Sequence, residues 1–345
     1  MLNVAVIGCG DMGKKHATAW SARPEATVIA VCDVNVEHSH RMAEKFQTQS
    51  YGDWREAIAH SPLDVISICT PANTHHDIAV AAAKRGKHVL CEKSMALNLA
   101  DAEEMIATAN AHNVHLQVSH QYRGLSRYRI MKKIIDNGTL GSPVFIRFME
   151  MREVRPKLAM HRKSQNGGPV HDMSGHLFDL ARFFTGSEPE SVTATGNIFS
   201  KGKQRLAAID DFGIDVAEIQ VRFAGDHCLS VGINWGLPEG TPSYSHEAVH
   251  GPNGVAYTQD RENPDLNLGE ISATTNVIVK NAEGTITIKC QSDFEGPEVC
   301  IDQFVARIAS ESPSQCNGKA GYDALKLIMA TLESIETGRT IYLNK

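Results

Sequence analysis

The chain has 345 residues, of which 42% are hydrophobic and 21% charged, and its formal net charge at pH 7 is −6. This length and apolar content suffice for two domains with separate cores, so a two-domain globular protein is expected. The slightly acidic balance argues against broad nucleic-acid binding, which needs a strongly basic surface.

Residues 1–121 alternate β-rich runs with helical stretches. The chain starts directly in a strand pattern without a basic leader, and no apolar run approaches the roughly 20 residues that span a bilayer, so a cytoplasmic protein without a membrane partner is expected. Strands and helices in turn predict a doubly wound parallel sheet of the Rossmann type. The expected strands are 3–7, 27–32, 64–69, 88–92 and 114–119, and the expected helices are 12–22, 75–86 and 99–112.

The sequence GCGDMG at residues 8–13 follows the first strand and opens the first helix. Gly8 suits a tight turn, Gly10 lets a pyrophosphate approach the backbone, and Gly13 permits close helix packing. Asp33 ends the second strand, 20 residues after Gly13, where its carboxylate would accept hydrogen bonds from ribose hydroxyls and repel a 2′-phosphate. NAD is therefore preferred over NADP, and a ligand-free tight turn is the less favoured alternative.

Two more strand ends carry polar residues. TPANTHH follows the third expected strand at residues 70–76, and Glu92 and Lys93 follow the fourth in VLCEKSM. The carboxyl ends of parallel strands lie at one edge of a sheet, where ligands bind in open α/β folds. A charged pair after a strand is more often a surface loop, so Glu92 and Lys93 alone would not identify a site.

Beyond residue 121 the pattern changes to an α+β domain with a mostly antiparallel open sheet, expected over 122–345. Apolar and polar residues alternate over 217–223, a second strand follows over 227–235, and NAEG at 281–284 is typical of a hairpin turn. Glycine, proline and serine over 236–254 predict the longest loop. Further helices are expected near 128–137 and over 325–335, the latter ending at Gly338.

Pro169 opens another helix, which places Asp172, His176 and Asp179 along one narrow stripe. The stripe has three interpretations. It is a solvated face, a metal site, or a proton relay in which a carboxylate fixes the tautomer of an imidazole. A metal site is the least favoured, since no HExxH pattern accompanies the stripe and a further ligand is missing.

Basic residues and cysteines leave further choices open. The run REVRPKLAMHRK at 152–163 is rich in arginine and lysine, and it could bind a carboxylate, a phosphate or the cofactor pyrophosphate, or be a solvated loop. The eight cysteines contain no CxxC pair. Buried reduced thiols are favoured over a disulfide framework, a zinc site or a nucleophile for the four that lie in or after strand-like runs: Cys9, Cys32, Cys69 and Cys91.

Taken together, these motifs resemble the Gfo/Idh/MocA oxidoreductase family, named for glucose-fructose oxidoreductase and inositol dehydrogenase. The resemblance covers the first 185 residues by motif order and spacing, and the remainder only by architecture. The motifs are GCGDMGKKHA (8–17), VCD (31–33), TPxxxH (70–75), GKHVLCEKS (86–94), QYR (121–123), LG (140–141) and GGPVHDMSGHLFDL (167–180).

The resemblance implies a Lys, Asp and His set beside the nicotinamide and the reacting carbinol. Lys93 matches the lysine of the family's EKP motif, and Asp172 and His176 match its DxxxH helix. His176 would take the hydroxyl proton as hydride leaves carbon, Asp172 would orient the imidazole, and Lys93 would stabilise the developing alkoxide. Arg123, Arg155 and His161 join these three as expected substrate contacts. The expected cofactor contacts are Gly8, Gly10, Asp11, Met12, Gly13, Asp33, Thr70, Pro71, Asn73, His75, Glu92, Lys93 and Gln121.

Two positions depart from the family pattern. Ser94 replaces the usual proline after the lysine, which frees a backbone N–H and loosens the turn that aims Lys93. Pro169 replaces the third glycine that many members have before the helix. Neither change removes a functional group.

The expected activity is NAD-dependent oxidation of a secondary hydroxyl on a sugar, cyclitol or sugar derivative. An NAD-dependent glycosidase that oxidises only transiently, and a non-catalytic dinucleotide-binding regulator, are the alternatives. The resemblance also implies a homodimer or homotetramer formed through the C-terminal sheet.

Overall fold

The computed structural model describes residues 1–59, 62–259, 275–291, 297–310 and 317–343. These residues form two compact units. The first unit holds the described residues within 1–121, 164–166 and 296–326, and the second holds those within 122–163, 167–295 and 327–345. The described residues of two segments beyond residue 121, 164–166 and 296–326, thus belong with the N-terminal unit.

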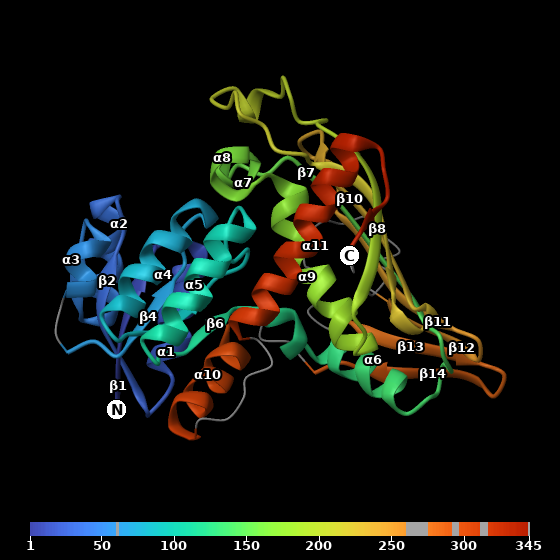
Figure 1. Cartoon of the computed structure of the whole chain (residues 1–345), viewed down its shortest axis with the longest axis horizontal. Coiled ribbons are helices and arrows are strands. Elements are labelled where there is room, and N and C mark those ends of the chain that lie inside the picture. Colours follow the sequence, from blue (N-terminus) through green and yellow to red (C-terminus); the bar gives the residue numbers. More distant parts are fainter. Residues whose placement is uncertain (60–61, 260–274, 292–296, 311–316, 344–345) are drawn as a thin grey trace. The chain divides into compact units, whose positions relative to one another are not determined.

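A six-stranded parallel sheet with the order β3-β2-β1-β4-β5-β6 forms the centre of the first unit (Figure 1). This is the strand order of a doubly wound dinucleotide-binding fold, so the prediction for the N-terminal domain is confirmed. Its strands are β1 (Leu2–Ile7), β2 (Ala26–Cys32), β3 (Gln49–Tyr51), β4 (Val65–Ile68), β5 (His88–Cys91) and β6 (Leu116–Val118).

Helices pack on both sides of this sheet because its central strands β1, β4 and β5 are buried on both faces. Helix α1 packs on α2 and α10, where the rings of Trp20 and Phe304 meet edge to face at 6.5 Å, and α4 packs on α3 and α5. The sequence analysis did not identify α2, α3, α10 or the short strand β3. The helices of this unit are α1 (Asp11–Ser21), α2 (Val36–Phe46), α3 (Trp54–Ala59), η1 (Ala72–Thr74), α4 (His75–Lys84), α5 (Leu99–Ala111) and α10 (Glu298–Ser310).

The second unit is built on a nine-stranded sheet with the order β14-β13-β12-β11-β7-β10-β9-β8-β15. Only β7 and β10 pair in parallel among these strands, so the predicted, mostly antiparallel sheet is confirmed. Its strands are β7 (Phe145–Glu153), β8 (Pro189–Asn197), β9 (Val216–Phe223), β10 (Cys228–Leu237), β11 (Tyr244–Gly251), β12 (Gly254–Gln259), β13 (Asn276–Asn281), β14 (Gly284–Lys289) and β15 (Ile341–Tyr342).

Helices α6 and α9 contact each other and cover one face of this sheet (Figure 1). No helix of the described residues is both long and apolar enough to cross a membrane. The remaining helical segments are η2 (Gln121–Gly124), α6 (Ser126–Asp136), α7 (Leu158–His161), α8 (Lys163–Asn166), α9 (Pro169–Thr185), η3 (Gln204–Leu206), η4 (Ala224–Asp226) and α11 (Gly318–Thr337), which precedes Gly338 at φ +67°.

The prediction of a long loop over 236–254 is wrong. Strand β11 (Tyr244–Gly251) crosses the middle of that range, and its Ala248 and Val249 are buried as it pairs antiparallel with β7. Glycine, proline and serine lie mainly on either side of this strand, in a loop at 238–243 and a turn at 252–253. The composition located the start of the loop but not its end, because pairing with β7 overrides the loop preference of these residues.

Candidate active site

The glycine-rich turn after β1 has room for a ligand at a helix N-terminus. Gly8 has φ +97°, and a Cβ there would lie 2.6 Å from the Cys69 carbonyl oxygen. A Cβ on Gly13 would lie 1.8 Å from the Gly8 carbonyl oxygen. A Cβ on Gly10, by contrast, would meet no atom within 4 Å. The first and third glycines therefore satisfy packing, and the second leaves open space beside the first turn of α1.

Asp33 is fixed beside this turn. Its Oδ2 accepts the Cys9 N–H at 2.7 Å and its Oδ1 accepts the Asn35 N–H at 2.8 Å. Each carboxylate oxygen keeps a lone pair for a further donor, so the half-buried side chain can still receive ribose hydroxyls. Asp11 is exposed in the first turn of α1 and Met12 is half-buried.

The loop after β4 brings the TPANTHH residues to the same edge of the sheet. Thr70 and Pro71 are half-buried and Asn73 is exposed. The Asn166 Oδ1 accepts the Ala72 N–H at 2.9 Å, which ties the 164–166 segment to this loop. Three of the four expected cofactor contacts here are thus available at the surface, and the fourth, a histidine, is not.

That fourth residue, His75, is buried at the start of α4. Its Nδ1 lies 2.8 Å from the Ser94 carbonyl oxygen and its Nε2 lies 2.9 Å from the Thr70 carbonyl oxygen. Burial lowers the pKa of His75, although the two carbonyl contacts act in the opposite direction. The ring therefore links the loop after β4 to the turn after β5.

Lys93 is half-buried in that turn, between two buried neighbours, Glu92 and Ser94. The Lys93–Ser94 peptide bond is cis. The Oε1 of Glu92 lies 2.9 Å from Nε2 of His16, a buried residue of α1. Burial raises the pKa of Glu92, but the hydrogen bond from His16 and the charge of Lys93 outweigh burial, and the pKa lies below its usual value.

Helix α9 carries the proposed proton relay. Pro169 occupies the first turn of this helix and follows Gly168. A Cβ on Gly213 would lie only 2.4 Å from the Gly168 Cα. Asp172, His176 and Asp179 are only 7%, 4% and 2% exposed. The solvated-face interpretation of this stripe is therefore wrong, because the stripe is buried together with the apolar side of the helix.

Aromatic rings and an ion pair hold the stripe within the second unit. Tyr122 stacks on His176 with ring centroids 4.1 Å apart and an interplanar angle of 5°. Arg123 donates from Nε and Nη2 to the two carboxylate oxygens of Asp179 at 2.7 and 2.6 Å. Arg123 therefore has a structural role beside its expected substrate role, and Tyr122, between two residues that were selected from the sequence, was missed.

An acidic pair that sequence reasoning also missed lies on the helix-facing side of the second sheet. Glu150 of β7 and Glu247 of β11 are both buried. Tyr128 donates its hydroxyl to Glu247, and Arg127 pairs with the same carboxylate at 3.2 Å. Burial raises the pKa of Glu150, partly offset by Arg152. The alternating sequence FIRFMEMRE at 145–153 could have indicated Glu150, because it places this acid on the same strand face as Ile146 and Phe148.

The basic run at 152–163 is partly paired. Arg152 contacts Glu150 at 2.9 Å, and Arg162 contacts Asp211 at 2.9 Å. Arg155 lies over the ring of Trp235 at 5.4 Å. His161 is buried, with its Nε2 3.1 Å from the Arg155 carbonyl oxygen. Neither a bare cationic patch nor a fully solvated loop describes this segment.

The described cysteines are free thiols. Cys9, Cys32 and Cys91 are buried as expected, whereas Cys69 is half-buried. Burial raises the pKa of the Cys9 and Cys32 thiols to about 12, which suppresses the reactive thiolate. No group of three or more His, Cys, Asp or Glu side chains within the described ranges is arranged to hold a metal ion.

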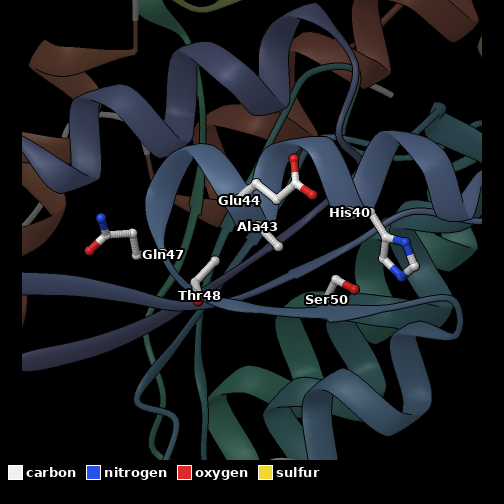
Figure 2. Close-up of a pocket in the computed structure, with 6 residues that line it drawn as sticks. All are labelled: His40, Ala43, Glu44, Gln47, Thr48 and Ser50. Carbon is white, nitrogen blue, oxygen red and sulfur yellow. The ribbon is translucent and has the colours of Figure 1, made fainter.

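The first unit also has a surface hollow that does not include the residues of the candidate active site (Figure 2). Helix α2 runs from the carboxyl end of β2 to the amino end of β3, and the hollow lies between the second half of α2 and β3. It is therefore at the edge of the sheet opposite the dinucleotide fingerprint. Its lining residues are His40, Ala43, Glu44, Gln47, Thr48 and Ser50.

Comparison with protein-family models gives two matches. Residues 2–120 match a model described as the oxidoreductase family with an NAD-binding Rossmann fold. Residues 128–257 match the model of the GFO/IDH/MocA C-terminal domain. The first match lies in the first unit and the second match lies in the second unit.

Similar proteins include several dehydrogenases. The chain is 28% identical to the myo-inositol 2-dehydrogenase of Thermotoga maritima over 353 residues, which cover 100% of this chain and 99% of the relative. It is 30% identical to the D-glucoside 3-dehydrogenase of Escherichia coli, with coverage of 99% and 97%. A solved structure of levoglucosan dehydrogenase with NADH and levoglucosan aligns over 100% of both chains with a TM-score of 0.85 at 23% identity, which shows the common fold.

Proposed function

This chain belongs to the Gfo/Idh/MocA oxidoreductase family, and we propose that it transfers a hydride from a secondary hydroxyl of a sugar or cyclitol to NAD. One observation carries the proposal. In a chain with the full dinucleotide fingerprint, Asp172 and His176 are buried one turn apart on α9 and the imidazole is held by a stacked ring. A dinucleotide-binding regulator has no need of such an arrangement.

NAD fits the first unit. The open space at Gly10 beside the N-terminus of α1 suits a pyrophosphate, and the anchored Asp33 carboxylate suits an unphosphorylated ribose. NAD would supply the hydride acceptor. The proposed direct contacts are Gly8, Gly10, Asp11, Met12, Gly13, Asp33, Thr70, Pro71, Asn73, Lys93 and Gln121, whereas the buried His75 and Glu92 support them from behind.

His176 is the proposed general base. Its neutral imidazole accepts the hydroxyl proton, and Asp172, one helical turn earlier, orients the ring and stabilises the imidazolium that forms. Lys93 places a positive charge where the alkoxide develops. In this proposal His176 and Lys93 act on the reacting hydroxyl, and Asp172 acts through His176.

The substrate is proposed to be neutral. Arg152 and Arg162 are paired with carboxylates, and the buried Glu150 and Glu247 on the helix-facing side of the sheet disfavour a phosphate or carboxylate nearby. Carboxylates and tyrosine hydroxyls accept and donate hydrogen bonds that suit a polyol. Arg155 and His161 remain proposed substrate contacts beside this region.

The deciding experiment measures NADH formation by the purified protein with NAD, and separately with NADP, across neutral cyclitols, aldoses and glycosides, sugar acids and sugar phosphates. Turnover of a neutral polyol with NAD is expected. Preference for a sugar phosphate would overturn the neutral assignment. Cleavage of a glycoside without net NADH would replace the dehydrogenase by the glycosidase alternative, and binding of NAD without any turnover would favour a regulator.

A homo-oligomer through the second sheet is also proposed. Phe148 of β7 packs on α6 and α9, so its side of the sheet faces the helices. Phe145, Met149 and Met151 of the same strand lie on the opposite, outer face, where each is paired with a residue of β11. On that outer face Phe145 is 54% and Tyr244 is 52% exposed. Light scattering should give a multiple of the chain mass, and Phe145→Glu should reduce it. A monomeric wild type would refute this assignment.

A further inference from the structure

Lys93 lies on a turn, between two neighbours that are each held by a buried histidine. Glu92 and Ser94 are each 5% exposed, whereas Lys93 between them is half-buried. Ser94 stands where the family pattern has a proline, so the ring that would restrict this turn is missing. Other contacts must fix the direction in which the lysine leaves the backbone.

The residue before Lys93 is held by a directed chain of hydrogen bonds. The Trp20 indole N–H can only donate, and it lies 3.2 Å from the Ser67 Oγ. Ser67 is then free to donate its own proton to Nδ1 of His16 at 2.8 Å, which leaves the Nε2–H of His16 to donate to Glu92 at 2.9 Å. This assignment gives every one of the four groups a partner with a neutral imidazole.

The residue after Lys93 is held by the second buried histidine. His75 lies between the Ser94 and Thr70 carbonyl oxygens, at 2.8 and 2.9 Å. A neutral imidazole donates one of these hydrogen bonds and the protonated ring donates both. In either state the ring bridges the loop after β4 and the turn that carries Lys93.

We propose that His16 and His75 are positioning residues for Lys93, acting through Glu92 and Ser94. His16 comes from the helix that the glycine-rich turn opens, and His75 comes from the loop after β4. Both proposed cofactor-binding segments are thereby linked to the lysine turn. The proposal rests on the function proposed above for Lys93, and it concerns contacts within the first unit alone.

Loss of either clamp should misdirect the lysine. Misplacement by about 1 Å costs roughly 100-fold in rate, so His16→Leu and His75→Leu are expected to lower kcat by about 10-fold to 100-fold. Dissociation constants for NAD should change by a smaller factor than kcat. His16→Gln and His75→Gln keep an N–H of similar reach and should recover part of the loss.

The matched control is His76→Leu. His76 is the neighbour of His75, but its nitrogens contact Asp77 at 2.9 Å and Glu104 at 3.0 Å, away from the lysine turn. Its kcat should stay at the wild-type value. Melting temperatures identify any leucine variant that fails to fold, and Ser67→Ala, a smaller truncation in the same chain, then tests His16 in its place.

A second readout does not depend on turnover. Trace acetylation by acetic anhydride, followed by peptide mass spectrometry, measures the reactivity of Lys93 relative to an exposed lysine such as Lys201. We expect at least a threefold change in the two leucine variants and none in His76→Leu. If Lys93 reactivity changes in the leucine variants but the wild-type protein oxidises no substrate, the proposed function is wrong and the positioning role is still supported. Wild-type kcat and wild-type Lys93 reactivity in folded His16→Leu and His75→Leu would overturn the positioning role.

Discussion

Lys93 and His176 are held in different ways by the two units. Lys93 lies on a turn, and its neighbours are fixed by hydrogen bonds from the buried rings of His16 and His75. His176 lies in the middle of α9, where the backbone hydrogen bonds are already satisfied. There the helix is held in position by the stacked ring of Tyr122, the Arg123–Asp179 ion pair and the close approach of Gly213 to Gly168 at the helix start.

The difference has a physical reason. A turn has no repeating hydrogen-bond pattern, so side chains must satisfy and orient its backbone one group at a time. A helix fixes its own backbone and needs only lateral packing to fix its rotation and position. Lys93 therefore has polar support beneath its turn, and His176 has shape support around its helix.

The largest test concerns the proposed base itself. His176→Ala should lower turnover by roughly 100-fold or more, because general-base catalysis contributes about that factor. Steady-state kinetics with the best neutral polyol measure it. His171→Ala removes another buried imidazole from the same helix and serves as the matched control. Equal losses in both variants would mean that the helix was damaged and no base removed.

The shape support of α9 is tested at its start. Gly213→Ala should lower the free energy of unfolding by about 1–3 kcal/mol, since a Cβ there would lie 2.4 Å from the Gly168 Cα and 2.5 Å from the Gly167 carbonyl oxygen. Denaturant unfolding measures the loss. Gly52→Ala, whose Cβ would meet only a Val36 methyl at 3.5 Å, is the control. A neutral result at Gly213 would show that this start of the helix is not tightly packed.

The stacked ring should contribute less. An aromatic pair adds about 0.5–1.5 kcal/mol beyond its area, so Tyr122→Leu is expected to lower kcat roughly threefold to tenfold. Tyr122→Phe keeps the ring face against His176 and should stay within about twofold of wild type. If Phe and Leu lower kcat equally, the hydroxyl rather than the stack matters, and the comparison drawn above fails for the second unit.

The smallest effect is predicted for Glu92, and it concerns the pH dependence of stability. The pKa of Glu92 lies below its usual value of 4.5 in the folded chain, so the unfolded chain binds more protons as pH falls below 4.5. The stability that this carboxylate contributes is complete above that pH and is lost as pH falls through the folded-state pKa. Glu92→Gln should therefore flatten the low-pH part of the stability curve.

Thermal unfolding of wild type and Glu92→Gln between pH 3 and pH 7 checks this prediction, with Glu104→Gln as an exposed control that should follow wild type. Curves of identical slope for wild type and Glu92→Gln would show that the His16 contact does not favour the ionised carboxylate.

Much of the first unit could be predicted because local pattern and topology agree there. The strand, glycines, helix, strand and acid occur in an order that leaves little choice, and the sheet order β3-β2-β1-β4-β5-β6 follows. The second unit was predictable in class but not in detail. Strand β11 was taken for a loop because only its partner β7 makes it a strand.

Site residues divide along the same line. Lys93, Asp172 and His176 could be selected because the motifs that contain them resemble those of a known family. Tyr122, Glu150 and Glu247 could not, because a tyrosine in a short turn or a glutamate in a strand has no distinctive spacing. His16 and Ser67 are 51 residues apart in the chain, and no pattern in the sequence predicts that they share a hydrogen bond.

The sequence by itself determined the two domain types and the preference for NAD, because these depend on the order and spacing of residues along the chain. The same motifs indicated the family, and the resemblance supplied the three residues proposed for the chemistry. Tertiary structure alone decided whether the Asp172–His176 stripe is solvated, whether the basic run is free, and what holds Lys93 in place. Those questions concern burial and partners, and both are supplied by residues distant in the chain.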